Sequence, residues 1–545
     1  VISMARLSSW IALLVTHVAA TNTPVISLCG NIATDTTLSV SSLYIMTCRV
    51  FVKAGTTLTV EAGTTVYAVN ALSNAGTAVA LVVERGGRLI ADGTATLPIT
   101  FTTLNPEPSL YEVGGTATMN GHWGGLIFLG NAPTAAGSYE SNFVDGLSGY
   151  TYGGTDPNDS SGILRYLRVW YGGALIGEGN EINGITFAGV GAGTVVEHVE
   201  VAFNQDDGFE FFGGTVHAKW LSVLFVGDDA IDTDEGFQGK LQFIYVMTGA
   251  GGDKGFEMDS KTGGNLDSMP RSHPEVFSAT IVGGGASAHT GGVIRLREGT
   301  GGKFANIVVA HVAERAVRID QCGSVSLTQT LPAQTTSIGH VGDPSSTGYL
   351  YFSQNNVLSP IHSEHANGPI RNDCDSTVLA FNTNTGSGLQ DFAQLDGTCL
   401  DYTCMSTAIS PLPDAGLCNH INEDASTIDS FFETVTCQGA FKSASDNWLA
   451  GWSWLDCRGT LLGGTCTSSA SNVISTHAST ADLTSSCSNE CNFMGDGVAG
   501  ECNDGGSGAA NALCSKGTDC TDCGPRVHCI DCPTTCQASN SALAD

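Results

Sequence analysis

The amino-acid sequence predicts an all-β protein whose short strands wind into a parallel β-helix (solenoid), followed by a small disulfide-rich domain. Three observations support this prediction. Short apolar runs alternate with polar residues and are punctuated by 69 glycines among 545 residues, so we expect strands and few long helices. A strand–turn–strand pattern recurs at intervals in the low twenties, which is typical of a solenoid. Nine of the 19 cysteines fall between Cys487 and Cys536, which indicates a separate domain held by disulfides.

The first twenty residues have the pattern of a secretory signal peptide. An arginine precedes an apolar run, and Val18 and Ala20 satisfy the small-residue rule for cleavage after Ala20. No later window offers the roughly 20 uninterrupted apolar residues that a membrane span needs. We therefore expect a secreted or cell-surface protein whose cysteines form disulfides, with Cys29 and Cys48 as the one pair that the sequence suggests.

The net charge restricts the classes of partner. The chain has 53 Asp and Glu residues against 22 Lys and Arg residues, which gives a formal charge of −31. Nucleic acids and anionic membranes repel so acidic a protein, whereas divalent cations and neutral glycans suit it. We therefore expect no nucleic-acid partner.

The rhythm of the sequence divides the chain into five regions. Strand patterns fade after about residue 347 into loop-like sequence with seven cysteines. Within that sequence, the aromatic stretch Asp446–Gly464 is expected to close the open end of the solenoid. The predicted regions are a signal peptide (1–20), a parallel β-helix (21–347), a disulfide-containing region that closes the solenoid (348–467), a Ser/Thr-rich linker (468–486) and a Cys-rich module (487–545).

Successive repeats align side chains into columns. Glu210, Asp232 and Glu257 occupy equivalent positions that are 22 and 25 residues apart. Because side chains alternate across a strand and coils stack about 4.8 Å apart, each column points either inward or outward. Residues Ser260–Pro274 break the period and are expected to form a long loop. The predicted inward column is Phe209, Ile231, Phe256, Ile294 and Val317, and the outward columns are Glu210, Asp232, Glu257, Arg295 and Arg318, and Phe212, Asp234, Asp259, Arg297 and Asp320.

The outward columns create a charge problem. Carboxylates about 5 Å apart repel by up to about 3 kcal/mol per pair at a protein surface. The arginines of the same columns are expected to pair with Glu257, Asp259 and Asp320, although exposed pairs contribute only about 0–1 kcal/mol. A bound calcium ion would also reduce this repulsion between carboxylates, because calcium takes about 6–8 oxygen ligands. The alternative is that the aspartates are solvated turn residues at strand ends and bind no ion. The predicted calcium ligands, called here the acidic ladder, are Asp206, Asp207, Glu210, Asp228, Asp229, Asp232, Asp234, Asp253, Glu257 and Asp259.

Several stretches resemble one known group of proteins. GGRLIADGTATLPITFTT, GHWGGLIFLGNAP (Gly121–Pro133), DDGFEFFGGTVHAKWL and SFFETVTCQGAFKSASDNWLAGW (Ser430–Trp452) are similar to exported bacterial proteins of the pectate-lyase-like right-handed parallel β-helix superfamily. The likeness covers roughly Cys29 to Gly464 and implies an exported β-helix, while most members of the group are uncharacterised. The C-terminal segment resembles Cys/Asp modules of secreted marine protist proteins and, distantly, calcium-binding Notch-type repeats.

The same superfamily implies an enzymatic alternative. In polygalacturonases, aspartates on successive coils precede an Arg/Lys strand motif, and NQDDGF, GDDAID and VIRLR are similar in order. That resemblance implies Asp207, Asp228 and Asp229 as catalytic groups, with Arg295 or Arg297 binding a uronate carboxylate. The Gly-His-Gly element of those enzymes is absent. A calcium-dependent lyase is also compatible with the residue types, with Glu210, Asp232 and Glu257 holding the metal and Arg295 as base.

The sequence therefore predicts a secreted or cell-surface structural or adhesion protein that binds a glycan or a surface protein. Calcium is the one cofactor that the residue types suggest, and solvated aspartates without a bound ion are the open alternative. The alternative is a polysaccharide hydrolase or calcium-dependent lyase that acts on acidic glycans through the Asp206–Asp259 face. His217, His289 and His311 are interpreted as ordinary surface or turn residues.

Overall fold

The computed structural model describes most of the chain between residues 23 and 466. The predicted signal peptide, linker and Cys-rich module lie outside the described residues, and so does His289. The described residues are 23–69, 78–104, 120–136, 150–177, 180–249, 252–260, 264–285, 292–312, 315–328, 349–360, 369–374, 380, 409–418, 423–462, 464 and 466.

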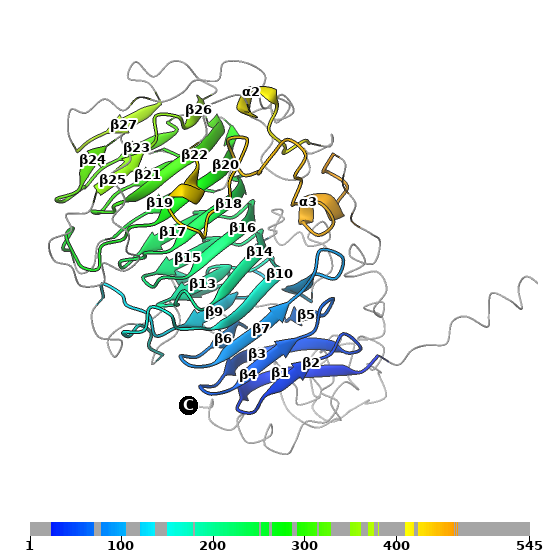
Figure 1. The fold of residues 1–545 in the computed structure, drawn as a ribbon. Helices are drawn as coiled ribbons and strands as arrows, with labels where there is room; N and C mark the ends of the chain where they lie inside the picture. Colours follow the sequence, from blue (N-terminus) through cyan, green and yellow to red (C-terminus); the bar gives the residue numbers. More distant parts are fainter. Residues whose placement is uncertain are drawn as a thin grey trace, which may run out of the picture. The chain divides into compact units, whose positions relative to one another are not determined.

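The strands form a right-handed parallel β-helix with three stacks of parallel strands, which confirms the predicted fold class (Figure 1). The first stack contains β2 (Thr36–Leu38), β4 (Thr57–Val60), β7 (Arg88–Asp92), the first halves of β10 (Gly162–Trp170), β14 (Val195–Ala202), β16 (His217–Leu224), β18 (Lys240–Met247), β20 (Glu275–Gly285) and β22 (Gly302–Val312), then β25 (Tyr349–Phe352) and β24 (Ser326–Thr328). The second stack contains the first halves of β1 (Val25–Ile32) and β3 (Leu43–Val52), then β5 (Thr65–Ala68), β8 (Ile99–Thr103), the second halves of the six long strands, and β26 (Val357–Pro360).

The third stack carries the predicted columns. It contains the second halves of β1 and β3, then β6 (Leu81–Val83), β9 (Leu126–Leu129), β13 (Ile185–Ala188), β15 (Phe209–Phe212), β17 (Ile231–Asp234), β19 (Phe256–Met258), β21 (Ile294–Leu296), β23 (Val317–Ile319) and β27 (Ile370–Asn372). Outside the stacks, β11 (Leu175–Gly177) and β12 (Asn180–Glu181) form an antiparallel hairpin. The helical elements are α2 (Ala415–Cys418), the 3-10 helix η5 (Ala425–Thr427) and α3 (Trp454–Cys457).

A single left-handed residue joins the first stack to the second in each long strand. In β10 and β14, Arg165 pairs with Glu197 and Leu167 pairs with Val199, so the register skips the residue between them. A positive φ at this position redirects the chain between two extended halves. The bend residues are Tyr166, His198, Trp220, Phe243, Ser278 and Asn306, with φ between 46° and 63°.

The predicted inward column is confirmed. Phe209 pairs with Ile231, Ile231 with Phe256, Phe256 with Ile294 and Ile294 with Val317, and all five side chains are buried in the main core cluster. In a closely packed core of this kind, removing a single methyl group lowers the free energy of unfolding by a measurable amount. The inward side chains of the third stack therefore form one continuous column.

Shortening this column tests its packing. We expect Ile231→Val to lower the free energy of unfolding by about 1 kcal/mol, because it removes one fully buried methyl group. The measurement is urea denaturation. Ile90→Val on β7, where the side chain is half-buried, is the control, and equal losses in both variants would contradict the central position of Ile231.

The region after residue 347 differs from the prediction. Strands continue to Asn372, because β25, β26 and β27 add to the three stacks. The described residues 409–418 and 423–462, called here the strap, then run back along the outside of the helix (Figure 1). Phe432 packs on Phe277 and Tyr351 of the first stack, and the strap residues that follow cover the second stack. Asn306 Nδ2 donates to Glu423 O at 2.8 Å, whereas Arg168 Nη1 donates to Trp452 O at 3.2 Å. The predicted cap, Asp446–Gly464, therefore covers the side of the helix and not its end.

The physical reason is the outer face of the second stack. Trp170, Tyr245 and Leu224 point away from the main core there, and a second apolar cluster forms only when strap residues such as Trp448 and Trp454 cover them. Large apolar side chains on a solenoid face need such cover. The repeat pattern does not identify the segment that covers these side chains.

Four disulfides are present in the described part of the chain. Cys29 and Cys48 are joined as the sequence suggests, and the other pairs are Cys322–Cys374, Cys418–Cys437 and Cys457–Cys466. Among the described residues, no helix has the length and apolar character needed to cross a membrane.

Candidate metal site on the acidic ladder

The turns that enter the third stack place the acidic ladder. Each turn delivers two residues before its strand, so Asp206, Asp228 and Asp253 occupy equivalent positions, as do Asp207, Asp229 and Lys254. Glycine allows the coils to approach closely at the entry to β15, since a Cβ on Gly208 would lie 2.6 Å from Ala230 O. The turn residues of neighbouring coils are therefore held next to one another.

Hydrogen bonds lock the second turn column between coils. Asp207 Oδ1 accepts the N–H of Asp229 at 2.9 Å, and Asp229 Oδ1 accepts the N–H of Lys254 at 2.6 Å. Each aspartate thus uses one carboxylate oxygen to satisfy the backbone of the next coil. The other oxygens remain in the acidic ladder.

The strand column follows the predicted register. Glu210 pairs with Asp232, Asp232 with Glu257, and Glu257 with Arg295. These side chains point away from the core, yet Glu210 is only 9% exposed, and Asp207 and Asp229 are 6% and 4% exposed. The predicted outward direction of the strand column is therefore confirmed, but neighbouring coils and turns cover the carboxylates, which are buried.

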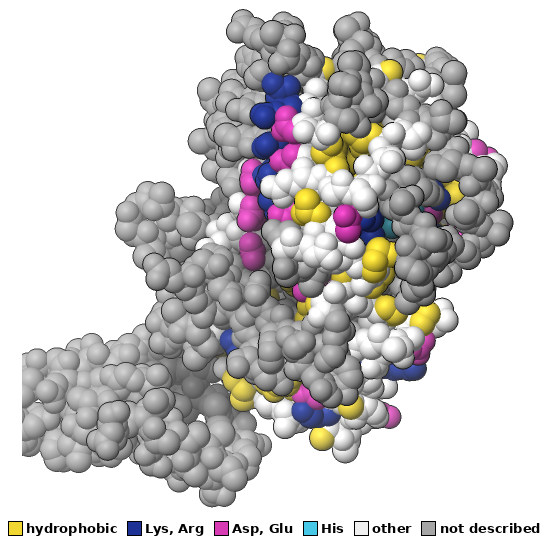
Figure 2. All heavy atoms as spheres, turned by 90° about the vertical axis from the view of Figure 1, so that its left-hand side faces the viewer, with side chains coloured by type: hydrophobic (Ala, Val, Ile, Leu, Met, Phe, Trp, Pro, Cys, Tyr) yellow, Lys and Arg dark blue, Asp and Glu magenta, His cyan; other side chains and the backbone are white. Residues whose placement is uncertain are grey.

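One end of the acidic ladder is neutralised by the chain itself. Arg297 Nη2 lies 2.6 Å from Glu257 Oε2 and 2.7 Å from Asp259 Oδ2. Arg295 pairs with Asp320 at 3.1 Å, and Arg318 pairs with the same carboxylate at 3.0 Å. The predicted arginine pairs are therefore present. Figure 2 shows acidic and basic side chains gathered in one narrow band on this face, with basic side chains toward one end.

Lys254 also neutralises carboxylates at this end of the acidic ladder. This residue was not identified from the sequence. Its Nζ contacts Asp253 and lies 3.8 Å from Glu257 Oε1, and the residue is 3% exposed. Aligning QDDGFE, GDDAID and GDKGFE puts Lys254 in the column of Asp207 and Asp229. The signal was present in the sequence as a lysine where the two preceding repeats have aspartate.

The other end of the acidic ladder concentrates buried negative charge. Among the described residues, Asp207, Asp229 and Asp232 form no ion pair with lysine or arginine. Burial, together with neighbouring carboxylates, raises the pKa of all three well above the ordinary value for aspartate. Asp232 Oδ1 is inaccessible to solvent and has no hydrogen-bond partner. A buried carboxylate oxygen without a partner is costly, so this position suits a proton or a cation.

The carboxylate oxygens converge in four groups. Within each group one oxygen per residue lies within 4.8 Å of the others, which is the separation expected when oxygens share a calcium ion at about 2.3–2.6 Å. Asp234 and Asp259 belong to none of these groups: Asp234 Oδ1 accepts the N–H of Glu235, and Asp259 is bound to Arg297. The groups are Asp206, Asp207 and Asp228; Asp207, Glu210 and Asp232; Asp228, Asp229 and Asp253; and Asp229, Asp232 and Glu257.

The residues of the enzymatic alternative are only partly brought together. Asp228 shares one group with Asp207 and another with Asp229. Carboxyl groups this close are nearer than the roughly 6.5–9.5 Å of inverting glycosidases. Arg295 and Arg297 are engaged in ion pairs, and carboxylates raise the pKa of Arg297 despite partial burial. The geometry therefore offers neither arginine as an unpaired ligand or base.

A second polar cluster, also missed by the sequence reasoning, lies under the strap on the second stack. Arg168 and Glu200 are neighbours in its outward column and are 2% and 0% exposed. Glu200 Oε1 accepts Trp170 Nε1–H at 3.0 Å and Trp454 N–H at 2.8 Å, and Oε2 accepts the Ser222 hydroxyl at 2.9 Å. Burial raises the pKa of Glu200 to about 7.

His217 and His311 are strand residues rather than turn residues. His217 begins β16, where burial lowers its pKa to about 4, and His311 lies in β22. The bend residue His198 stacks between Tyr166 and Trp220, with ring centroids 4.3 and 4.4 Å apart. These side chains serve packing, and none belongs to the four carboxylate groups.

Comparison with known proteins identifies the family. A family model described as a pectate-lyase like beta helix domain matches residues 30–366. Searches of curated proteins and of solved structures gave no significant match. The matched residues cover more than half of the chain and coincide with the three stacks of strands described above. The chain therefore belongs to the pectate-lyase-like beta helix domain family.

Proposed function

We propose that this protein is an extracellular binding protein that holds Ca²⁺ on the acidic ladder and uses that face to bind a glycan or a surface protein. The observation that carries the proposal is the buried Asp232 Oδ1, which lacks a partner although carboxylates from three coils surround it. Calcium suits this donor set, because it is a hard cation that accepts mixed carboxylate and carbonyl oxygens in irregular geometry.

The position of the ion follows from the internal cations. Lys254 and Arg297 already neutralise the carboxylates around Glu257 and Asp259. The group of Asp207, Glu210 and Asp232 draws on the two coils that precede Lys254, and it contains the buried Asp232 Oδ1 that has no hydrogen-bond partner, so it gains from a metal ion. We assign the primary calcium site to this group.

An extracellular location is the second part of the proposal. The disulfides are compatible with an oxidising compartment. A calcium ion held near a surface would keep positive charge available for hydroxyl or carboxylate oxygens of a partner, while the negative total charge keeps the chain away from polyanions such as nucleic acids.

Calorimetric titration with Ca²⁺ tests the metal site. We expect binding to the full-length protein, with affinity reduced at least tenfold in Asp232→Asn and little changed in Asp234→Asn. The control changes a carboxylate on the same strand that lies outside the four groups. Equal affinity in both variants, or no heat of binding in the wild-type protein, would rule out this site.

An acidic-glycan hydrolase or lyase is the second candidate. One observation favours it: burial raises the pKa of Asp207 and Asp229, a feature of catalytic carboxyl groups. Incubation with polygalacturonate or alginate, with and without EDTA, distinguishes the two functions. We expect retention of Ca²⁺ without new reducing ends or unsaturated products, and either product would establish the enzymatic function instead.

A further inference from the structure

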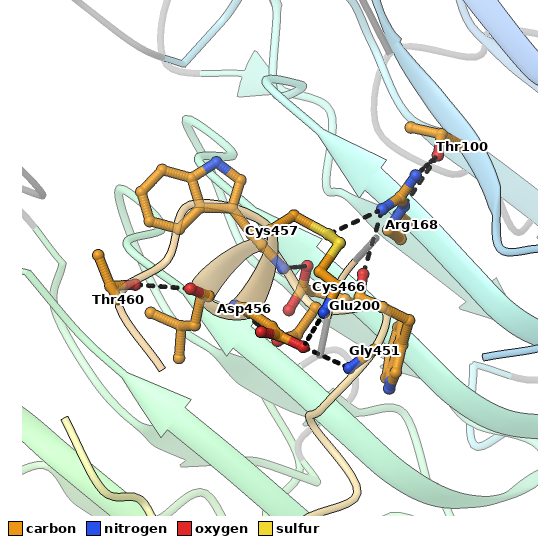
Figure 3. The surroundings of a disulfide bond; sticks show 12 residues. Thr100, Arg168, Glu200, Gly451, Asp456, Cys457, Thr460 and Cys466 are labelled. Carbon is orange, nitrogen blue, oxygen red and sulfur yellow. Dashed lines mark hydrogen bonds between the residues drawn. A yellow bond between two sulfur atoms is a disulfide. The ribbon is translucent and has the colours of Figure 1, made fainter. Parts of the chain in front are cut away.

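The disulfide between Cys457 and Cys466 lies beside a buried positive charge (Figure 3). Cys457 is the last residue of α3 in the strap, and Arg168 comes from β10 beneath it. Arg168 Nη1 lies 3.7 Å from Cys457 Sγ. Because Arg168 is 2% exposed, water screens its charge poorly at this sulfur.

The guanidinium of Arg168 has only neutral hydrogen-bond partners. Its Nε and Nη2 donate to Thr100 Oγ1 at 2.8 and 2.6 Å, and Nη1 donates to Trp452 O at 3.2 Å. Within the described part of the chain, no carboxylate oxygen lies within 4.0 Å of it. Burial lowers the pKa of Arg168 to about 10. Glu200 is the charged neighbour of Arg168, and a thiolate formed on Cys457 would add a second favourable interaction with the guanidinium.

The two cysteines of the disulfide have different neighbours. The backbone N–H of Cys466 donates to Asp456 Oδ2 at 3.0 Å, whereas the guanidinium of Arg168 lies beside Cys457 Sγ (Figure 3). Negative charge is therefore favoured on the Cys457 sulfur. Both residues are partly exposed, which gives an external thiol access to the bond.

We propose that Cys457–Cys466 is a redox-active disulfide that exchanges with dithiol reductants. A thiolate of the reductant attacks Cys466 Sγ, the sulfur–sulfur bond breaks, and its electron pair leaves on Cys457 as a thiolate beside Arg168. The second thiolate of the reductant then attacks the reductant's own sulfur in the mixed disulfide. The reductant departs oxidised, and Cys466 departs as a thiolate that takes up a proton.

Thiol chemistry explains the direction of this reaction. A neighbouring cation lowers a cysteine pKa from about 8.5 to between about 3.5 and 7.5. A thiol of lower pKa is the better leaving group, and a stabilised thiolate makes the dithiol state easier to reach. Arg168 therefore promotes both the rate and the extent of reduction at this disulfide.

Redox titration of the full-length protein tests the proposal without any substitution. The protein is equilibrated with graded ratios of reduced to oxidised dithiothreitol, and free thiols are trapped by alkylation and assigned by peptide mass spectrometry. We expect Cys457–Cys466 to open at a ratio at least tenfold lower than Cys29–Cys48, Cys322–Cys374 or Cys418–Cys437. Opening together with these three, or after them, overturns the proposal.

The role of Arg168 has its own readout. In Cys466→Ser, the rate at which Cys457 is alkylated is measured as a function of pH. This rate is expected to rise with pH, with a midpoint below about pH 7.5. Adding Arg168→Gln should move that midpoint toward about 8.5, and Arg168→Lys should restore part of the shift. If the Arg168 variants do not fold, the pH dependence of alkylation in Cys466→Ser is the deciding measurement. A midpoint of about pH 8.5 or higher would contradict the claim that Arg168 lowers the pKa of Cys457.

Discussion

Saturating Ca²⁺ is expected to raise the free energy of unfolding of the β-helix by about 2.7 kcal/mol when the free ion is at 100 times its dissociation constant. The gain arises because the folded chain gathers Asp207, Glu210 and Asp232 around one position, whereas the unfolded chain does not. A bound cation also removes repulsion between buried carboxylates and gives Asp232 Oδ1 a ligand.

Thermal unfolding in EDTA and in a series of Ca²⁺ concentrations measures this effect. The melting temperature should rise with each addition in the wild-type protein and in Asp234→Asn, and it should be nearly insensitive to Ca²⁺ in Asp232→Asn. We also expect Asp232→Asn to be more stable than the wild-type protein in EDTA, since it removes a buried charge. A melting temperature that ignores both EDTA and Ca²⁺ in the wild-type protein would exclude a structural calcium ion.

Titration of Glu200 is expected to lower the free energy of unfolding of the wild-type protein by about 2–3 kcal/mol between pH 5 and pH 8, and Glu200→Gln should abolish this contribution. In the folded protein, burial raises the pKa of Glu200 to about 7 from an ordinary value near 4.5. The folded state therefore holds this proton more tightly than the unfolded state does. Glu200 costs little stability near pH 4.5, and the cost grows as pH rises toward 7 and is constant above it.

The groups around Glu200 make the substitution selective. Arg168 is the charged neighbour that lowers its pKa, and Trp170, Ser222 and Trp454 donate hydrogen bonds that also favour the anion. A glutamine is nearly isosteric, accepts the two N–H donors through its oxygen and places its amide group toward the Ser222 hydroxyl, which can accept.

Urea denaturation at several pH values checks this prediction. The difference in free energy of unfolding between wild-type protein and Glu200→Gln should change with pH by the stated amount. Ser222→Ala is the matched control: it keeps the titrating carboxyl and removes one bond to the anion, so the pH dependence should persist and its midpoint should rise. Parallel curves for the wild-type protein and Glu200→Gln would show that Glu200 does not titrate in this range.

The third stack could be predicted from the sequence because each coil there repeats a short local pattern. Phe209, Ile231 and Phe256 alternate with acidic neighbours at nearly constant intervals, and period and alternation suffice to place them. The convergence of Asp207 with Glu210 and Asp232 follows from the same register. Their burial does not, because it depends on how closely neighbouring turns pack, and no local pattern encodes that distance.

The second stack was harder to interpret for a different reason. Its strands continue from the first stack through one left-handed residue, and the aromatic residues Tyr166, Trp220 and Phe243 at that position carry no sequence signal for a positive φ. No local pattern distinguishes Arg168 and Glu200 from the residues of a solvated strand face. Only the contact with Trp452 and Trp454, far along the chain, turns them into a buried cluster.

The course of the strap has a consequence for the order of folding. Coils of the helix pair residues that are a few tens of positions apart, whereas the hydrogen bond between Arg168 and Trp452 spans 284 positions. Contacts of such high contact order close a long loop and form after local ones. Winding of the coils should therefore precede docking of the strap, and until that last step the growing chain exposes Trp170 and its apolar neighbours to aggregation.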